Sequence, residues 1–242
     1  MTDKKTGSKI FSNMIFVTFA ALLCCALWGS ATPFIKIGSA LMIPQKHVPS
    51  TMLFAGVRFT FAGILTILIY SIARRKFLYP KRENVGKVAL IGSVQTVIQY
   101  IFFYIGLAHT SGVKGTIISG STAFCTILVS CLVFRQEKLT IRKTVACLIG
   151  FSGIILVNLK GLKLEMNLLG DCFVLFSAIA YGFSSSLMKI FSKDEDPVII
   201  SGYQFIMGGF IMICIGLVSG GIIVIESLKA AMVLMYLALL SA

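Results

Sequence analysis

The stretch AYGFSSSLMK, residues 180–189, decides the fold because it repeats a pattern from the start of the chain. Residues 27–36 read LWGSATPFIK, with the same order of an aromatic residue, a glycine, a hydroxyl side chain and a closing lysine. All four correspondences occur at one offset of 153 residues, and the pairs are Trp28 and Tyr181, Gly29 and Gly182, Thr32 and Ser185, and Lys36 and Lys189. A fixed spacing between similar segments indicates an internal duplication.

A second pair of segments repeats in the same order. RFTFAG, residues 58–63, matches QFIMGG, residues 204–209, at an offset of 146. The change of offset corresponds to a connecting loop that is seven residues shorter in the second copy. Two helices rich in small residues can resemble each other by chance, but two matches in the same order favour a duplicated unit.

Composition places this duplicated unit in a membrane. The chain has 242 residues, of which 57% are hydrophobic and 13% charged, and its mean hydropathy is +0.94. Soluble domains are about 45–50% apolar and about 25% charged. The net charge of +13 arises from basic residues between apolar runs, where anionic lipid headgroups would lie. We therefore expect contact with membrane lipids and no binding to nucleic acid.

The sequence offers little for enzyme or metal chemistry. Its seven cysteines lie in or at the ends of apolar runs without a CxxC pair, and the only histidines are His47 and His109. There is no HExxH motif and no pair of aspartates within an apolar run. We expect no catalytic residue, no metal site and no cofactor, and we rank an intramembrane enzyme below a transporter.

Seven apolar intervals are long enough to cross a bilayer, which takes about 20 mostly apolar residues. By residue number they lie at about 14–34, 51–73, 88–113, 115–134, 144–159, 172–188 and 197–225. An eighth run, MVLMYLALLSA from residue 232, is too short. The N-terminus has the basic and then apolar pattern of a signal peptide. Its apolar run continues past Pro33, however, and we expect an uncleaved first helix.

The distribution of basic residues orients these spans. With residues 1–13 as a cytoplasmic tail, fifteen lysines and arginines fall on the cytoplasmic side and six on the other. The positive-inside rule therefore predicts a cytoplasmic N-terminus, in a plasma or bacterial inner membrane. Five spans per repeat, an odd number, then place the two copies in opposite orientations. Inverted repeats are typical of secondary transporters, whose substrates bind near the midplane between the copies.

Small and polar residues in the first apolar run agree with this interpretation. Gly29, Ser30 and Pro33 are expected to interrupt the first helix beside a polar cavity. An unpaired backbone carbonyl is tolerated at this depth only next to protein or water. Lys36 then marks the membrane interface, with its stem along the apolar surface.

The repeated segments also resemble the EamA-type transporters of the drug/metabolite transporter superfamily. The motifs are ALWGSATPFIK, RFTFAG, FRQEKLTIRK and LLGDCFVLFSAIAYGFSSSLMKIFSK, and the resemblance covers essentially the whole chain. It implies ten helices in two inverted five-helix halves, with both termini cytoplasmic, that carry small metabolites. The chain departs from the family at SGSTAF, residues 119–124, where a proline is common, and in the absence of the ninth, tenth and most of the eighth helix.

We therefore predict an all-α, polytopic helical membrane protein built as an inverted repeat of five-helix units. The first unit is residues 14–160, and the second is residues 168–242, truncated after the start of its third helix. This gives about seven complete spans plus a partial eighth. For that reason we expect the sequence to be an incomplete gene product.

Eight residues are candidates for substrate binding, namely Trp28, Thr32, Arg58, Gln95, Gln99, Tyr100, Tyr181 and Ser185. Trp28 and Tyr181 lie at matching depths, and we favour aromatic walls of a cavity over simple packing. Gln95 and Gln99 share one helix face and either line the substrate path or join helices by hydrogen bonds. Arg58 either binds a substrate carboxylate or, as we slightly favour, has a structural role.

No acidic residue lies deep in a predicted span. Asp171, near the start of the sixth span, is expected to stabilise that helix through its dipole. Glu137 is predicted to be a cytoplasmic loop charge or an anchor between the halves. Proton-coupled transporters usually relay protons through buried carboxylates or histidines. We therefore expect uniport or exchange rather than proton antiport.

The predicted function is secondary transport of a small organic metabolite, amino-acid-like or amphiphilic, by alternating access at a midplane cavity between the inverted repeats. The expected partners are this small-molecule substrate and membrane lipids. The residues specify neither the substrate, nor the direction of transport, nor the oligomeric state. The alternatives are a non-transporting seven-helix receptor or sensor and a truncated, inactive transporter fragment.

Overall fold

The computed structural model describes residues 14–43, 47–110, 112–158, 167–225 and 227–241, and every regular element in these ranges is helical. In chain order the elements are α2 (Met14–Met42), α3 (Val48–Arg74), η1 (Arg82–Asn84), α4 (Val85–Ile91), η2 (Gly92–Ile98), α5 (Gln99–His109), α6 (Gly112–Gly120), α7 (Thr122–Leu128), η3 (Val129–Val133), α8 (Ile141–Asn158), α9 (Leu168–Phe191), α10 (Pro197–Val218) and α11 (Leu228–Ser241). η1 is a 3₁₀ turn, whereas η2 and η3 are π-helical. The predicted all-α fold is confirmed.

Among the residues that the structure describes, five helical segments are long and apolar enough to cross a membrane. They are Val48–Arg74, Arg82–His109, Lys114–Val133, Leu168–Phe191 and Pro197–Val218. α2 has 29 residues and α8 has 18, whereas α11 has only 14. A helix of 14 residues is shorter than a hydrocarbon core about 30 Å thick. The helices therefore form a polytopic membrane protein, and α11 agrees with the predicted partial eighth span.

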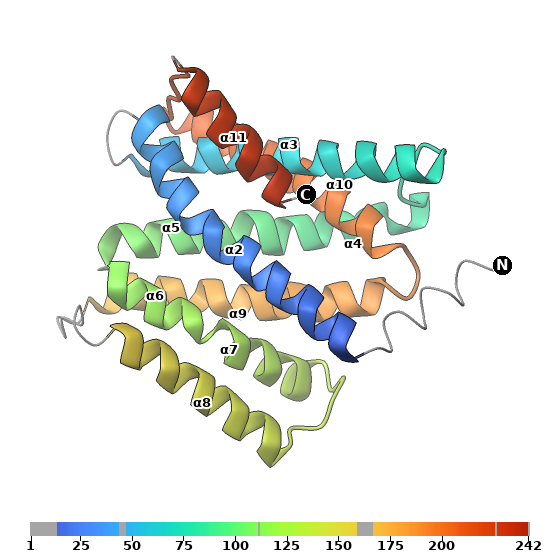
Figure 1. Ribbon diagram of the computed structural model, residues 1–242, viewed down its shortest axis with the longest axis vertical. Helices are drawn as coiled ribbons and strands as arrows, with labels where there is room; N and C mark the ends of the chain where they lie inside the picture. Colours follow the sequence, from blue (N-terminus) through green and yellow to red (C-terminus); the bar gives the residue numbers. More distant parts are fainter. Residues whose placement is uncertain (1–13, 44–46, 111, 159–166, 226, 242) are drawn as a thin grey trace.

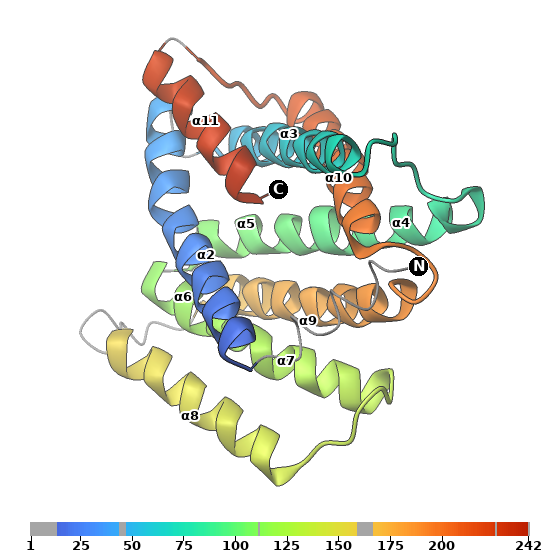
Figure 2. The same ribbon diagram turned by 45° about the vertical axis from the view of Figure 1, so that its right-hand side comes forward.

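Helices that are distant in sequence lie side by side, as Figures 1 and 2 show. α3 packs along α10, and the helix formed by α4, η2 and α5 packs along α9. α6 and α7 cover another side of α9, and α8 lies beyond them at the edge of the bundle. α2 crosses the face nearest the viewer in Figure 1 and packs against α11.

The loops gather at two ends of the bundle. The end on the right of Figure 1 holds loops 75–81, 134–140 and 192–196, and we call it the basic end. The other end, where α2, α5 and α10 end, is called the opposite end. Loops of the two sequence repeats meet at both ends.

The first helix is not interrupted, and the break predicted from residues 29–33 is wrong. α2 runs as one α-helix over its whole length. The Ser30 hydroxyl donates a hydrogen bond to the carbonyl of Leu27 at 2.7 Å and lies 3.0 Å from the hydroxyl of Tyr236 in α11. One proline removes a single backbone hydrogen bond, and a neighbouring helix makes that loss tolerable in a membrane. Ser30 therefore joins α2 to α11.

Four glycines bring α3 and α10 into direct backbone contact. A Cβ atom added to Gly56 would lie 2.8 Å from the carbonyl oxygen of Gly209, and one added to Gly63 would overlap the carbonyl oxygen of Gly202. Residue numbers rise along one helix as they fall along the other, and the two helices are therefore antiparallel. Small residues permit this close approach, on which helix association in membranes depends.

These glycine contacts also carry the symmetry of the repeat. The offset of 146 relates Gly56 to Gly202 and Gly63 to Gly209, and each contact is therefore the counterpart of the other. An interface in which each patch contacts its own counterpart has twofold symmetry. Equivalent helices of the two copies thus run antiparallel, as an inverted repeat requires.

Phe59 and Phe205, which are also 146 residues apart, lie at the centre of this crossing. Their rings stack with centroids 5.4 Å apart and planes inclined by 11°. The twofold relation between the copies also holds for helices outside the crossing. α5 packs on α9, and in the equivalent contact α11 packs on α2. In both cases the third helix of one copy contacts the first helix of the other. The unit boundaries at residues 14–160 and 168–242 remain a prediction.

We predict that Gly63→Ala lowers the melting temperature of the purified protein. The new methyl group would overlap backbone atoms of α10, and overpacking of this kind costs about 1–3 kcal/mol. Gly150→Ala in α8 is the matched control, because nothing lies within 4 Å of a Cβ added there. Thermal unfolding in detergent compares the two variants, and equal melting temperatures would contradict the close crossing.

Candidate functional site

Arg58 places a positive charge inside the bundle. It lies on α3, ten residues after the helix begins, and only 4% of the residue is exposed. Its guanidinium carbon lies 4.4 Å from the centroid of the Phe59 ring. The guanidinium also interacts electrostatically with the side chains of Tyr100 and Tyr104 on α5. The arginine is therefore held among aromatic side chains.

The charge of Arg58 is not balanced by an acidic side chain. Its Nε atom is buried and has no hydrogen-bond partner. None of the Asp and Glu residues that the structure describes forms an ion pair with it. Burial of a charge without a counter-ion is costly. Charged residues within membrane spans face the bundle interior and mark functional sites.

Aromatic rings form a continuous group beside Arg58. The rings of Phe59 and Tyr100 meet edge-on with centroids 4.7 Å apart, and those of Tyr100 and Tyr104 are 5.8 Å apart. Tyr181 on α9 interacts electrostatically with Tyr100. The structure thus brings together three of the eight candidate residues, Arg58, Tyr100 and Tyr181, from three different helices.

Further buried polar atoms without hydrogen-bond partners lie in the helices around Arg58. They include the side-chain oxygens of Gln99, Thr96 and Gln204, and Thr96 and Gln204 are no more than 1% exposed. Thr96 belongs to the π-helical turn η2, which contacts α10 at Gly208. π turns are frequent at functional sites. The centre of the bundle therefore holds more hydrogen-bonding capacity than its own side chains use.

The other four candidate residues have not been assigned contacts with the group around Arg58. Gln95 is half-buried in η2, and Ser185 is half-buried on α9 one turn beyond Tyr181. The backbone of α2 includes positions 28 and 32, but the side chains of Trp28 and Thr32 lie outside the described part of the chain. A role for these four residues in substrate binding stays a prediction.

Two residues beside the site were not among the sequence candidates. Tyr104 lies four positions after Tyr100, a spacing that puts both on one helix face. Gln204 is the counterpart of Arg58 at the offset of 146. The alignment of RFTFAG with QFIMGG could have identified Gln204, because it places this glutamine at the position where the first copy has its buried arginine.

Polar contacts join the two copies at the basic end. Lys87 forms an ion pair with Asp194 at 2.6 Å, and the hydrogen bond from Lys87 lowers the pKa of the Asp194 carboxyl. Glu195 accepts hydrogen bonds from the backbone nitrogen of Lys81 at 2.9 Å and from Nδ2 of Asn84 at 3.0 Å. The loop after α3 and the loop after α9 therefore meet on one side of the bundle.

At the opposite end, hydrogen bonds to backbone groups join the two copies. The backbone nitrogen of Val224 donates to the carbonyl of Met42 at 3.0 Å, and that of Ile222 donates to Oγ of Ser50 at 3.0 Å. A cavity of about 370 Å³ lies at this end between α3, α10 and α11, and most of its lining is apolar. The two ends thus differ in one respect, because the apolar cavity lies at the opposite end, whereas ion pairs occur at both ends.

Asp171 is held at the opposite end. It lies in the first turn of α9, where the helix dipole favours a negative charge. It also forms an ion pair with Lys114 and accepts a hydrogen bond from Oγ1 of Thr110 at 2.7 Å. These contacts fasten the start of α9 to the turn between α5 and α6, which adds a tertiary contact to the role expected from the dipole.

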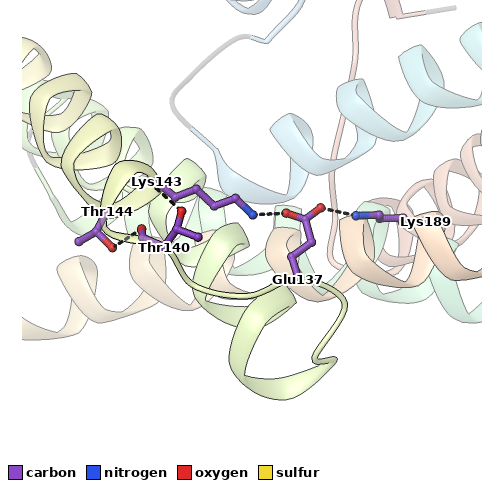
Figure 3. Close-up of polar contacts among 5 residues, drawn as sticks. All are labelled: Glu137, Thr140, Lys143, Thr144 and Lys189. Atoms are coloured by element: carbon purple, nitrogen blue, oxygen red, sulfur yellow. Dashed lines mark hydrogen bonds and ion pairs between the residues drawn. The ribbon is translucent and has the colours of Figure 1, made fainter.

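Glu137 connects two helices at the basic end, as Figure 3 shows. Its carboxylate accepts hydrogen bonds from Lys143 in α8 and from Lys189 near the end of α9, the latter at 2.5 Å. The hydrogen bonds from Lys143 and Lys189 lower the pKa of Glu137 from its ordinary value of 4.5 to about 2. Of the two roles considered for Glu137, this geometry supports an anchor between the halves.

Comparison with known sequences agrees with the duplicated architecture. The profile of the EamA-like transporter family matches residues 15–159 and, separately, residues 168–242. The chain belongs to this family. The two matched stretches correspond to the two copies whose second helices, α3 and α10, cross at the glycines.

Several curated proteins are similar to this EamA-family chain. An uncharacterized transporter of Archaeoglobus fulgidus is 23% identical over 187 residues, which are 77% of this chain and 62% of that protein. One of Methanothermobacter thermautotrophicus is 26% identical over 225 residues, 80% and 62% of the two chains. A WAT1-related chloroplastic protein of Arabidopsis thaliana is 23% identical over 196 residues, 78% and 46%. The chain thus spans about three fifths of the first two relatives, and no solved structure matches it.

We predict that Glu137→Gln lowers thermal stability at pH 7 and that the difference from the parent protein disappears in acid. Because the folded pKa is depressed from 4.5 to about 2, the contribution of the carboxylate is fully present above pH 4.5 and is lost as the pH falls toward 2. The difference between the melting temperatures of the two proteins, recorded from pH 7 to pH 2, measures this contribution of the carboxylate to stability. A difference that is constant with pH would contradict the paired carboxylate.

Proposed function

We propose that this EamA-family protein carries a small organic metabolite, amino-acid-like or amphiphilic, by secondary transport with alternating access. In this proposal the substrate binds beside Arg58, between the two inverted copies. The observation that supports it most is the unbalanced charge of Arg58 next to the antiparallel crossing of α3 and α10. Transporters built from inverted repeats bind their substrates at the interface between the repeats.

The depth of Arg58 suits a midplane site. Ten residues at 1.5 Å per residue place it about 15 Å along α3. Because α3 has 27 residues and is longer than a hydrocarbon core about 30 Å thick, we propose that Arg58 lies inside that core. Tyr100, Tyr104 and Tyr181 surround this level from two other helices.

The two ends of the bundle offer the contacts that an access cycle would break in turn. At the basic end, Lys87 and Asp194 and the bonds to Glu195 tie the copies together. At the opposite end the copies share the ion pair of Lys114 with Asp171 and hydrogen bonds from backbone nitrogens, and they line a cavity of about 370 Å³. Rocking of one copy against the other around the α3–α10 crossing would open one end while it closes the other.

The proposed orientation follows from the charges. The excess of lysine and arginine at the basic end supports a cytoplasmic position for that end, with the N-terminus on the same side. We propose a plasma membrane, or the inner membrane of a bacterium, as the location. In this orientation the cavity at the opposite end faces outward.

Transport is tested with the purified chain in proteoliposomes loaded with a mixture of amino acids, small organic acids, the neutral amides of those acids and small organic amines. We expect at least one compound to leave faster than from protein-free liposomes, as mass spectrometry of the external solution would show. Because no acidic residue pairs with Arg58 among the described residues, the rate should be similar with and without a pH gradient.

The outcomes separate two parts of the proposal. If no compound leaves faster than from empty liposomes, the transport function is contradicted. If flux occurs only in the presence of a pH gradient, transport stands, but uniport or exchange is excluded in favour of proton coupling. The Gly150→Ala protein is the control and should transport like the parent protein, because nothing lies within 4 Å of a Cβ added there and the residues around Arg58 are unchanged.

A further inference from the structure

We propose that the site beside Arg58 selects a small carboxylate with an apolar or aromatic body, and that Arg58 binds the carboxylate group. This inference rests on the proposed transport function and names its substrate class. Its starting point is the buried guanidinium, which is 4% exposed and has an unpartnered Nε. A guanidinium presents its N–H groups in a planar fork that matches a carboxylate.

An anion at this site would supply the missing counter-charge. None of the described acidic residues forms an ion pair with Arg58. Tyr100 and Tyr104, which interact with it, offer hydroxyl groups for hydrogen bonds and have no carboxylate. A substrate without an anionic group would leave the buried charge without a counter-ion, whereas a carboxylate would balance it.

The second copy shows that the crossing itself does not require the charge. Gln204 occupies the position equivalent to Arg58, on α10, and is 1% exposed. The two positions have the same relation to the glycine contacts, because the offset of 146 exchanges them. A neutral amide therefore suffices at one of the two symmetric places. The arginine at the other supplies a charge beyond what the packing of α3 on α10 demands.

The side chains around Arg58 suit a substrate whose remaining part is apolar or aromatic. Phe59, Tyr100 and Tyr104 form the aromatic group beside the guanidinium. The cavity at the opposite end is lined in part by Phe54, which lies one helical turn before Arg58 on the same face of α3. Its volume of about 370 Å³ is within the range of small-molecule pockets, about 300–1,000 Å³. A substrate with its body toward Phe54 would direct its carboxylate at Arg58.

Binding is tested by isothermal titration calorimetry on the purified chain in detergent. The probes are two matched pairs, phenylacetate with phenylacetamide and hexanoate with hexanamide, in which only the charged group differs. We expect at least one carboxylate to bind about tenfold or more tightly than its amide, the effect of a charge-assisted hydrogen bond. Equal affinities within both pairs, or no binding by either carboxylate, would overturn the proposal.

Three variants assign the preference to Arg58. Arg58→Gln copies the residue of the equivalent position and should lose the preference, whereas Arg58→Lys keeps the charge and should retain part of it. Arg82→Gln removes an exposed cation at the basic end and should retain all of it. A preference that survives Arg58→Gln in a protein that unfolds cooperatively would overturn the assignment.

The liposome assay distinguishes this inference from the transport function on which it rests. Flux of neutral or cationic compounds without a preference for carboxylates would overturn the carboxylate site and leave transport standing. Carboxylate binding that depends on Arg58, without flux of any compound, would support the site and contradict transport.

Discussion

The close approach of α3 and α10 is the constraint on which the rest of the structure depends. Gly56 and Gly63 meet Gly209 and Gly202 with no room for a side chain between the backbones. Lipid provides no hydrophobic force between helices, and contact at this distance is what joins them. Because each glycine pair is the counterpart of the other, one crossing fixes both the attachment of the two copies and their inverted relation.

The two copies share a shape but not a charge. The symmetric positions at the crossing hold Arg58 in one copy and Gln204 in the other, both buried. The ends differ as well, with the ion pair of Lys87 and Asp194 at the basic end and an apolar cavity at the opposite end. In the proposed transport cycle, the symmetry would allow two alternative arrangements of similar packing, and the charge of Arg58 would select one class of substrate.

The sequence predicted the features that depend on spacing and missed those that depend on tertiary contact. The match of RFTFAG with QFIMGG identified the two helices that cross, and the burial of Arg58 followed from its place in an apolar run. The predicted break at residues 29–33 was wrong, because Ser30 is held by Tyr236 of a helix far away in sequence. Lys189, the partner of Glu137 on α9, lies 52 residues further along the chain, which is too far for a local pattern to identify.

The inverted arrangement is tested most directly by cysteine labelling across a membrane. In a protein whose seven cysteines are replaced, single cysteines would be placed at Lys76 and Lys193 at the basic end and at His47 and Ser227 at the opposite end, all of them exposed. An impermeant maleimide should label the first pair from one side of the membrane and the second pair from the other. Labelling of positions 76 and 193 from opposite sides would contradict the inverted repeat, and with it the site between the copies.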